Sequence, residues 1–291
     1  MFERIKGILL FEKLLQRPDI DQAYKMVGPE DSWYDTITTV HRSLAEIQKQ
    51  NHEDWEITSH DGLPLKAEFY PGTTNKTVIW IHGYTSHAER ESAFPALFYR
   101  SMGFNVLIPY LRAHGPSGGK YISFGPLESL DLKAWIDGVN ERIDGSILIH
   151  GLSMGGGIAL DLATMALRNV KCILADAPSC SISAFLEGVA FYNSKKNPQK
   201  LADALARRFL RVFSVNAADY NRCENIKAGK YPLLLTAGSL EEQDAHLALI
   251  KERNPQPTTV LILPGCSHGN GMYKQTELYQ NAIREFTEMY M

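Results

Sequence analysis

Residues 147–160 read ILIHGLSMGGGIAL, and this stretch decides the fold. It opens with an apolar run typical of a buried strand, and the residues from Gly156 onward favour a helix. The turn between them holds the pattern Gly-x-Ser-x-Gly, in which glycines relieve crowding and the hydroxyl of Ser153 is presented above the sheet at a helix N-terminus. This setting predicts that Ser153 is a nucleophile. The alternative interpretation is a glycine-rich turn with an idle serine.

Short apolar runs and longer helical patterns alternate along the chain after residue 70. This order is typical of an α/β fold, in which parallel strands are joined by crossover helices. The predicted strands are Thr77–Ile81, Asn105–Ile108, Ser146–His150, Lys171–Ala175, Leu233–Ala237 and Thr259–Leu263. Helical patterns fall near residues 92–102, 128–141, 154–168, 243–252 and 273–290. Before them, residues 55–70 alternate in polarity around an Asp-Gly turn, which predicts a hairpin.

The sequence divides into three segments. Residues 1–50 are polar-rich with helical spacing, and they form a predicted N-terminal helical segment. Residues 51–291 form one predicted domain that carries the sheet. Within this domain, the interval 178–230 is too long for a simple connection and repeats apolar residues at helical spacing. We therefore expect a helical lid inserted over the sheet.

His268 is the predicted general base. A serine hydroxyl attacks effectively only when a base removes its proton, so a histidine has to reach Ser153 in the fold. His268 fits best, because it lies in the loop after the last predicted strand and before the C-terminal helical pattern. The chain order, with the nucleophile first and the histidine last, is the one expected on such a sheet. The alternative is a loop histidine that faces water.

The oxyanion that develops during such an attack needs two backbone N–H donors. Met154 follows the nucleophile and is predicted to supply the first. For the second, a His-Gly turn follows the predicted strand that ends at Ile81, so we expect the amide of Tyr84 to point at the same carbonyl. We interpret His82 as holding this loop by hydrogen bonding rather than as a second base.

Four motifs together resemble the α/β-hydrolase superfamily in its serine esterase and lipase-like form. They are His82-Gly83, Arg112-Ala113-His114-Gly115-Pro116-Ser117, Gly151-Leu152-Ser153-Met154-Gly155-Gly156 and Cys266-Ser267-His268-Gly269. The resemblance covers about residues 55–291, and it implies an eight-stranded, mostly parallel sheet flanked by helices, with a helical lid insertion. Ala113 replaces a glycine of the family's Arg-Gly-His-Gly-x-Ser segment. We interpret this loop, including His114, as architecture rather than chemistry.

The third member of the triad is where the sequence departs from the family pattern. Members usually have a Gly-x-x-Asp turn after the corresponding strand, whereas residues 238–244 read GSLEEQD. Counting from the glycine places the acid at Glu241, and a glutamate can also orient an imidazole, although its extra methylene changes the reach. Three alternatives stay open. They are Glu242, Asp244 and Asp176, the last at a strand end where some lipases of the superfamily carry their acid.

The predicted lid holds a largely aromatic cluster of Phe185, Leu186, Phe191 and Tyr192. If the lid folds over the sheet, this cluster forms an apolar wall above Ser153, with Phe185, Phe191 and Tyr192 as substrate-binding residues. Such a wall fits an apolar acyl or aryl ester of small to medium size. The same segment carries basic residues that we interpret as a solvated helical face, namely Lys195, Lys196, Arg207, Arg208 and Arg211.

The composition of the chain limits the binding partners and the cellular compartment that we expect for it. The chain has 291 residues and a formal net charge of -3 with no basic stripe, so nucleic acid is not an expected partner. Its four cysteines have no CxxC pair and no metal-ligand spacing, and we expect reduced thiols in a cytoplasmic protein without a metal site. The N-terminal residues lack the uninterrupted apolar run of a signal peptide, and no stretch approaches the length of a membrane span.

These observations predict a serine hydrolase that cleaves carboxylic esters through a Ser-His-acid triad and an acyl-enzyme, without a cofactor. A peptidase or a thioesterase uses the same constellation, so the leaving group stays open. An alternative from another class is a non-catalytic protein that binds a small molecule in the same fold. We expect no stable membrane insertion, and the oligomeric state, a homo-oligomer included, is left open.

Overall fold

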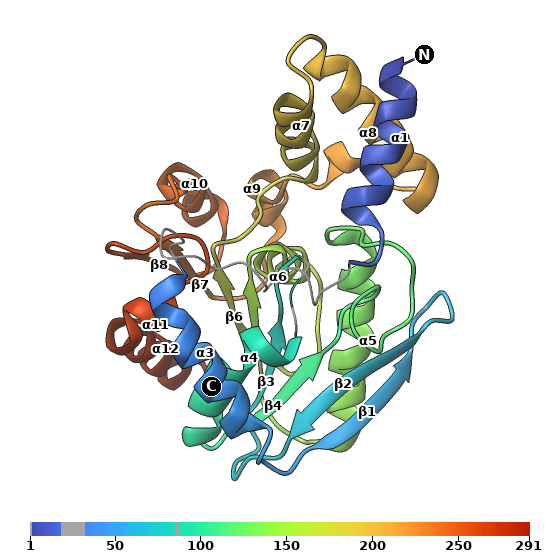
Figure 1. Ribbon diagram of the computed structural model, residues 1–291. Helices are drawn as coiled ribbons and strands as arrows, with labels where there is room; N and C mark the ends of the chain where they lie inside the picture. The colour runs from blue at the N-terminus through green and yellow to red at the C-terminus, as the bar shows by residue number, and fades with distance from the viewer. Residues whose placement is uncertain (1, 19–32, 85, 87) are drawn as a thin grey trace.

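The structure is a computed structural model that describes residues 2–18, 33–84, 86 and 88–291. Within these residues, one eight-stranded sheet has the order β1-β2-β4-β3-β5-β6-β7-β8 (Figure 1). Its strands are β1 (Glu53–Thr58), β2 (Pro64–Tyr70), β3 (Thr77–Ile81), β4 (Asn105–Pro109), β5 (Ile147–Leu152), β6 (Val170–Asp176), β7 (Leu233–Gly238) and β8 (Thr258–Leu263). Two pairs, β1–β2 and β2–β4, are antiparallel, and the others are parallel. The predicted mostly parallel α/β-hydrolase sheet is therefore confirmed.

Helices cover both faces of the sheet, because its central strands are buried on both sides. The helices of this body are α3 (Ile37–Ile47), α4 (Ala88–Ser101), α5 (Pro126–Arg142), α6 (Met154–Ala163), α10 (Asp244–Arg253), α11 (Gly271–Lys274) and α12 (Thr276–Tyr290). In β3, Ile79 and Ile81 belong to the core cluster that includes α5 and α6. Val78 and Trp80 belong to the cluster that includes α4 and α12. Alternate residues of one strand thus anchor the two helical layers.

Two of the predicted helices differ from the structure by more than a shift of their ends, one being cut short and one divided. The pattern over residues 154–168 ends as a helix at Ala163, since the amides of the next two residues turn back onto residues 161 and 162 and Asn169 adopts a φ of 60°. The pattern over residues 273–290 is divided into α11 and α12. Gln275, with φ of −116° and ψ of 46°, separates them because these angles are not helical.

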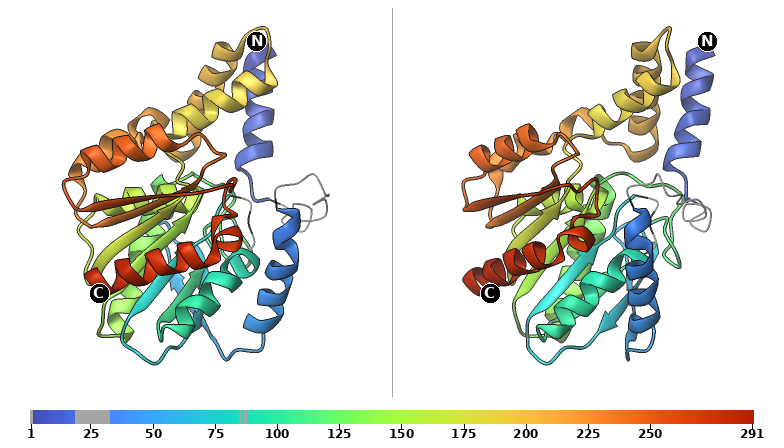
Figure 2. Two further views of the ribbon diagram at one scale, coloured as in Figure 1. Left: turned by 90° about the vertical axis from the view of Figure 1, so that its left-hand side faces the viewer. Right: turned by 60° about the vertical axis from the view of Figure 1, so that its left-hand side comes forward.

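The first helix belongs with the lid rather than with the sheet. α1 (Phe2–Leu15) lies beside α7 (Ile182–Asn193) and α8 (Pro198–Phe213), and the three project from the body together (Figures 1 and 2). A Cβ on Gly7 would lie 2.7 Å from the Cβ of Ala204, so α1 and α8 are in close contact. Phe11 is fully buried there, 6.0 Å from the ring of Phe213 between centroids. We call α1, α7 and α8 the lid layer.

The predicted N-terminal segment 1–50 therefore contributes to two parts of the molecule. α1 packs on α8 in the lid layer, whereas α3 packs on α4 in the body. Residues 19–32 of this segment lie outside the described residues. Helical spacing in the sequence identifies both helices, but it carries no information on which partner each one packs against.

The two ends of the lid meet at the edge of the sheet. Ser181 forms an isolated antiparallel bridge with Asn221, and the N–H of Arg222 donates to the carbonyl of Cys180 at 2.8 Å. Arg222 opens the short helix α9 (Arg222–Asn225) and is only 1% exposed. Its guanidinium donates to both carboxylate oxygens of Asp161 on α6, at 2.9 and 2.7 Å. A buried bidentate ion pair thus ties the lid to the helix that follows the nucleophile.

Replacing Arg222 by alanine is expected to lower the free energy of unfolding by about 3–5 kcal/mol, because the carboxylate of Asp161 would stay buried without its charge partner. Chemical denaturation followed by circular dichroism measures this change. Arg211→Ala, at an exposed position of α8, serves as the control and is expected to shift stability by about 0.5 kcal/mol or less. Equal stabilities for the two variants would contradict the assigned role of the ion pair.

The four cysteines are all free thiols. Cys180 and Cys223 lie at the two ends of the lid, and Sγ of Cys180 donates to the carbonyl oxygen of Pro178 at 3.5 Å. Among the described residues, no helix combines the length and the apolar character needed to cross a bilayer.

Candidate active site

Ser153 occupies the sharp turn between β5 and α6. Its φ of 58° and ψ of −112° lie outside the regions that L-residues favour, so the turn holds backbone strain. Glycines make the turn possible: a Cβ on Gly151 would lie 2.1 Å from the carbonyl oxygen of Gly155. A Cβ on Gly155 would lie 2.2 Å from the carbonyl oxygen of Ile81. The local structure is thus the strand-turn-helix setting expected from the sequence, with the serine at the carboxyl edge of the sheet.

The loop after β8 brings His268 to this serine. Nε2 of His268 lies 2.7 Å from Oγ of Ser153. Two features shape the loop: Gly269 adopts a φ of 71°, and Oδ1 of Asn270 accepts a hydrogen bond from the N–H of Ser267 at 2.9 Å. In the tautomer that carries its proton on Nδ1, Nε2 can accept the serine proton, which is the arrangement a general base requires.

Glu241 lies on the other side of the imidazole. Its Oε2 is 2.6 Å from Nδ1 of His268, and its side chain is 5% exposed. The second oxygen, Oε1, accepts a hydrogen bond from the N–H of Gly238 at 2.8 Å, and Gln243 donates to Oε2 at 3.2 Å. The backbone of its own turn therefore holds the carboxylate, and the longer side chain of a glutamate reaches the histidine from this position.

The other three candidate acids have different surroundings. Asp176 is 2% exposed at the end of β6, and its carboxylate accepts hydrogen bonds from Thr236 at 2.7 Å and Tyr279 at 2.9 Å. Burial raises the pKa of Asp176 to about 6. Glu242 adopts a φ of 54° in the turn, and Asp244 is the first residue of α10. Of the four acids that the sequence leaves open, the structure brings Glu241 into hydrogen-bonding contact with His268.

The hydrogen bond to Glu241 raises the pKa of His268 above its ordinary value, because the carboxylate stabilises the imidazolium. The charge of Glu91 acts in the same direction. A general base works only in its neutral form, so the reaction slows as pH falls through this pKa. A raised pKa moves that loss of activity to higher pH.

We therefore expect the acid limb of the pH dependence of kcat/KM to have an apparent pKa above about 6.5, the ordinary value for histidine. Hydrolysis of a p-nitrophenyl ester, followed by an assay whose signal is corrected for nitrophenol ionisation, gives this limb. Glu91→Gln removes one of the raising charges and is expected to shift the limb to lower pH. A limb at or below the ordinary histidine value in the unmodified protein would contradict the assigned base.

The Gly83–Tyr84 loop lies against the nucleophile. A Cβ on Gly83 would lie 3.6 Å from the Cβ of Ser153, so the backbone of this loop passes beside the serine. His82 holds the loop by two hydrogen bonds. Its Nδ1 is 2.8 Å from the carbonyl oxygen of Gly83, and its Nε2 accepts from the N–H of Leu111 at 3.2 Å. Met154 begins α6, where backbone N–H groups have no partner within the helix. The two predicted oxyanion donors thus belong to segments on either side of Ser153.

The side chain of Tyr84 joins this loop to the lid layer. Its hydroxyl donates to the carbonyl oxygen of Leu14 in α1. Its ring lies 5.0 Å from that of Phe124 and 6.2 Å from that of Phe185, which stack on each other at 4.2 Å between centroids. Of the three predicted substrate-binding residues, Phe185 is therefore packed against the residue that carries a predicted oxyanion donor.

Phe191 and Tyr192 do not form the expected wall above Ser153. Their exposed fractions are 75% and 87%. They lie in the last turn of α7, and this helix rises away from the sheet, so its C-terminal end is remote from the strand ends (Figure 2). We expected an aromatic wall because we assumed that the lid lies flat on the sheet. In the structure, α7 instead leads away from the sheet (Figure 2).

Two residues that the sequence did not single out contact the site. Oε2 of Glu91, in the first part of α4, accepts a hydrogen bond from the N–H of Gly83 at 3.1 Å. Nε1 of Trp33 donates to the carbonyl oxygen of His268 at 3.1 Å, and its ring lies edge-on to Tyr273 at 5.5 Å. For Glu91, the sequence offers only the general preference of carboxylates for helix N-termini, and this preference does not distinguish Glu91 from other acids.

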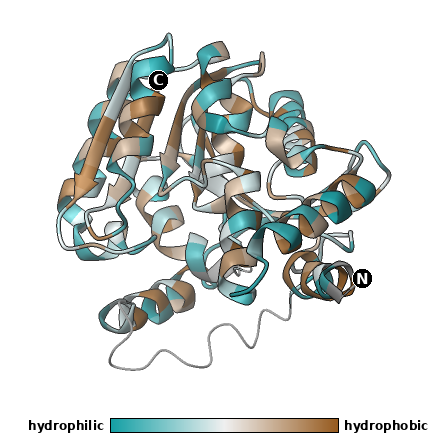
Figure 3. Ribbon diagram, turned by 90° about the horizontal axis from the view of Figure 1, so that it is seen from above, coloured by the Kyte–Doolittle hydropathy of each residue, from teal (hydrophilic) through white to brown (hydrophobic). Residues whose placement is uncertain are grey.

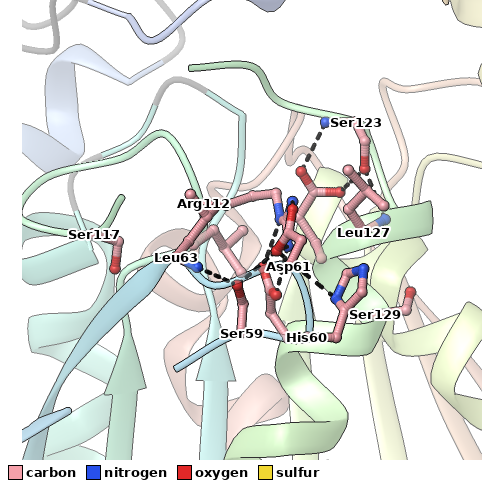
Figure 4. A network of polar contacts seen from close by, with 12 residues as sticks. Ser59, His60, Asp61, Leu63, Arg112, Ser117, Ser123, Leu127 and Ser129 are labelled. Carbon is pink, nitrogen blue, oxygen red and sulfur yellow. Dashed lines mark hydrogen bonds and ion pairs between the residues drawn. The ribbon is translucent and has the colours of Figure 1, made fainter. Parts of the chain in front are cut away.

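Within the described part of the chain, one cluster of residues has ligand types that a metal ion could use, namely His60, Asp61 and Asp131. Figure 4 shows that Arg112 occupies the same network. Its guanidinium donates to both oxygens of Asp131 at 2.7 Å and to both of Asp61 at 3.0 and 3.1 Å. Because this cation already pairs with both carboxylates, we assign the cluster a structural role. It anchors the Arg112–Ser117 loop, in agreement with its interpretation as architecture.

A family model described as serine aminopeptidase, S33, matches residues 72–222, just over half of the chain. The chain belongs to this family of α/β-hydrolases. The matched range includes Ser153 and the Gly83–Tyr84 loop, and it ends before the loops that carry Glu241 and His268.

Two curated relatives cover only parts of the chain. A stretch of 165 residues, 54% of this chain, is 33% identical to the multifunctional-autoprocessing repeats-in-toxin protein of Vibrio vulnificus. This stretch spans 3% of the toxin. The uncharacterized protein YqkD of Bacillus subtilis is 39% identical over 123 residues, which are 41% of this chain and 40% of YqkD. The chain thus matches a small part of the toxin and less than half of YqkD.

Solved structures match over much more of the chain. An esterase of Pyrococcus furiosus has a TM-score of 0.68 at 25% identity, with 96% of this chain and 98% of the esterase covered. Est1E of Butyrivibrio proteoclasticus, solved with ferulic acid, has a TM-score of 0.63 at 22% identity, with coverages of 81% and 98%. A proline iminopeptidase of Mycobacterium smegmatis has a TM-score of 0.58 at 14% identity, with the same coverages. The last two share the fold alone.

Proposed function

We propose that this chain is a serine hydrolase that cleaves carboxylic esters through the triad Ser153, His268 and Glu241. The observation that carries the proposal is the continuous hydrogen-bonded chain of these side chains, with 2.7 Å between Ser153 and His268 and 2.6 Å between His268 and Glu241. A nucleophile, a base that reaches it and an acid that orients the base are the three parts that acyl transfer requires.

In the proposed mechanism, Oγ of Ser153 attacks the acyl carbon while Nε2 of His268 takes its proton. Glu241 holds the imidazole in the required tautomer and stabilises the imidazolium. The amides of Tyr84 and Met154 donate to the developing oxyanion. His268 then protonates the leaving alcohol, and an acyl-enzyme forms. A water molecule, activated by the same histidine, releases the acid and restores the serine.

We propose small to medium acyl or aryl esters as the substrate class. The partly exposed rings of Tyr84 and Phe185 support this choice, since they offer an apolar surface next to the proposed oxyanion loop and pack on the buried ring of Phe124. The likeness to the Pyrococcus furiosus esterase supports ester hydrolysis over other acyl transfers. The mechanism needs no metal or organic cofactor, and the four free thiols support a reducing compartment such as the cytoplasm.

A second candidate is an aminopeptidase, which the description of the family favours. A specific observation supports it: the carboxylate of Glu91 lies beside the Gly83–Tyr84 loop and acts on the pKa of His268. A negative charge beside the loop that contacts the nucleophile is suited to an amine-bearing substrate.

A panel of substrates tests the two candidates against each other. It contains p-nitrophenyl esters of increasing acyl length, the corresponding acyl thioesters, and aminoacyl p-nitroanilides, each assayed with the unmodified chain and with Ser153→Ala. We expect the highest kcat/KM for a short or medium ester, with no turnover by the variant. Turnover of the anilides above that of every ester would overturn the ester proposal in favour of the peptidase. Absence of turnover throughout, in folded protein, would favour a non-catalytic binding protein.

A further inference from the structure

The positive charge of the chain is concentrated in the lid layer. Residues 2–15 and 182–213, which comprise the lid layer and the loop between α7 and α8, together hold nine basic and four acidic residues, a net charge of +5. Because the whole chain has a net charge of -3, all the other residues together carry −8. One end of the molecule is therefore strongly positive, although the composition as a whole is slightly acidic.

The side of α1 that faces away from α8 is apolar. Gly7 and Phe11 lie on the side that contacts the lid, so residues about half a turn away point to solvent. Ile5, Ile8 and Leu9 lie there, with exposed fractions of 54%, 36% and 66%. Neighbouring positions on a helix at spacings of three and four form one stripe. These three side chains therefore make a continuous apolar stripe on the outside of the molecule.

Cations flank this stripe on both sides. On one side, Lys6 and Lys13 line the same surface hollow as Ile5 and Leu9. On the other side, three arginines of α8 line a groove together with Ile8, namely Arg207, Arg208 and Arg211. Arg208 is paired with Glu12 of α1 at 2.6 Å, so Arg207 and Arg211 supply the positive charge on this side. The apolar stripe is thus bordered by basic side chains from two helices.

The C-terminal end of α7 extends the same surface. Nζ of Lys6 donates to the carbonyl oxygen of Asn193 at 2.5 Å, so α1 and the end of α7 are in contact. The strongly exposed Phe191 and Tyr192 directly precede this residue in the chain. Figure 3 looks down on the lid layer and shows apolar and polar residues interspersed on the helices near the N-terminus. We call this surface, formed by the stripe, its flanking cations and the end of α7, the docking face.

We propose that the docking face binds the surface of an anionic lipid bilayer. A helix with an apolar stripe, basic flanks and exposed aromatic residues suits the boundary between headgroups and acyl chains, where apolar side chains are inserted and cations contact lipid phosphates. Single exposed apolar residues are ordinary, but here three of them lie side by side on one helix and basic side chains flank them. Peripheral attachment of this kind requires no membrane-crossing helix.

Charge argues against a second copy of the chain as the occupant. Two such faces brought together would each carry the same positive excess, and like charges across an interface are unfavourable. An anionic bilayer supplies the complementary charge. An acidic protein would also do so, but an exposed apolar stripe on a helix, bordered by cations from that helix and its neighbour, is the pattern of an interfacial surface.

The docking face is joined to the proposed oxyanion loop, because Tyr84 donates to the carbonyl oxygen of Leu14 near the end of α1. Bilayer binding does not rest on the proposed hydrolase activity, however. Ser153→Ala is expected to bind vesicles as tightly as the unmodified chain. A failure of ester hydrolysis and a failure of membrane docking are therefore distinguishable.

Co-sedimentation with vesicles tests the proposal. The full chain is mixed with vesicles of phosphatidylcholine alone, and with vesicles in which one third of the lipid is phosphatidylserine. We expect binding to the anionic vesicles, weaker binding as salt is raised, and little binding to the neutral ones. Neutralising two cations in Lys13→Gln/Arg211→Gln is expected to weaken binding by about 30-fold, and Ile5→Glu/Leu9→Glu by about tenfold or more.

Met289→Glu is the matched control, because Met289 is 71% exposed on α12 and lies outside the docking face. It is expected to bind like the unmodified chain, and thermal melting verifies that every variant is folded. Binding that ignores lipid charge, or that survives both double variants, would overturn the proposal. So would a dimer in sedimentation velocity that Ile5→Glu/Leu9→Glu dissociates, since the face would then be an interface between copies.

Discussion

Replacing Ser153 by alanine is expected to lower kcat for a p-nitrophenyl ester by on the order of 10⁴- to 10⁶-fold. The variant keeps the oxyanion donors and the substrate surface but loses the atom that forms the acyl-enzyme. Steady-state kinetics on purified protein measure the change, and KM is expected to change far less than kcat.

Two controls make this result specific. The melting temperature of Ser153→Ala is expected to stay close to that of the unmodified chain, because the backbone strain at φ of 58° belongs to the turn and not to the hydroxyl. Ser183→Ala, in the lid helix α7, is expected to keep full activity. If Ser153→Ala retained activity within tenfold of the unmodified chain, the nucleophile would have to be another residue.

Glu241→Gln is expected to lower kcat by on the order of 10³- to 10⁴-fold with little effect on stability. A glutamine can still accept from the N–H of Gly238, but it carries no charge to stabilise the imidazolium and its amide can favour the wrong tautomer of His268. The same kinetic assay measures the effect.

The neighbouring Glu242→Gln is the matched control, since it makes the same chemical change one residue along and is expected to leave kcat within about twofold of the unmodified value. Asp176→Asn tests another of the alternative acids, whose carboxylate in the structure accepts from Thr236 and Tyr279. A larger loss of kcat in Asp176→Asn than in Glu241→Gln would contradict the assignment of the acid.

The sheet, Ser153 and His268 were predictable because the patterns that indicate them are local in the sequence. The strand-turn-helix pattern around Ser153 requires glycines at defined positions, and the structure places backbone within about 2 Å of where their Cβ atoms would lie. The acid was predictable only as one of four, since counting residues from Gly238 cannot tell how far a glutamate reaches. The distance from Glu241 to His268 depends on how two loops from different strands come together.

The remaining parts depend on long-range packing. The contact of Trp33 with the His268 loop joins residues that are 235 positions apart, and no periodicity in the sequence encodes it. The packing of α1 on α8 is of the same kind. The lid residues Phe191 and Tyr192 were misplaced for a related reason: helical spacing identifies α7, but it does not encode the angle at which this helix leaves the sheet.

Labelling with a fluorophosphonate probe, followed by mass spectrometry, tests the central claim most directly. An activated serine is modified by such a probe, whereas an ordinary hydroxyl is not. We predict one adduct per chain, located on Ser153, that is absent in Ser153→Ala and forms much more slowly in His268→Ala. Folded protein that stays unlabelled, or that carries its adduct on another residue, would contradict the account.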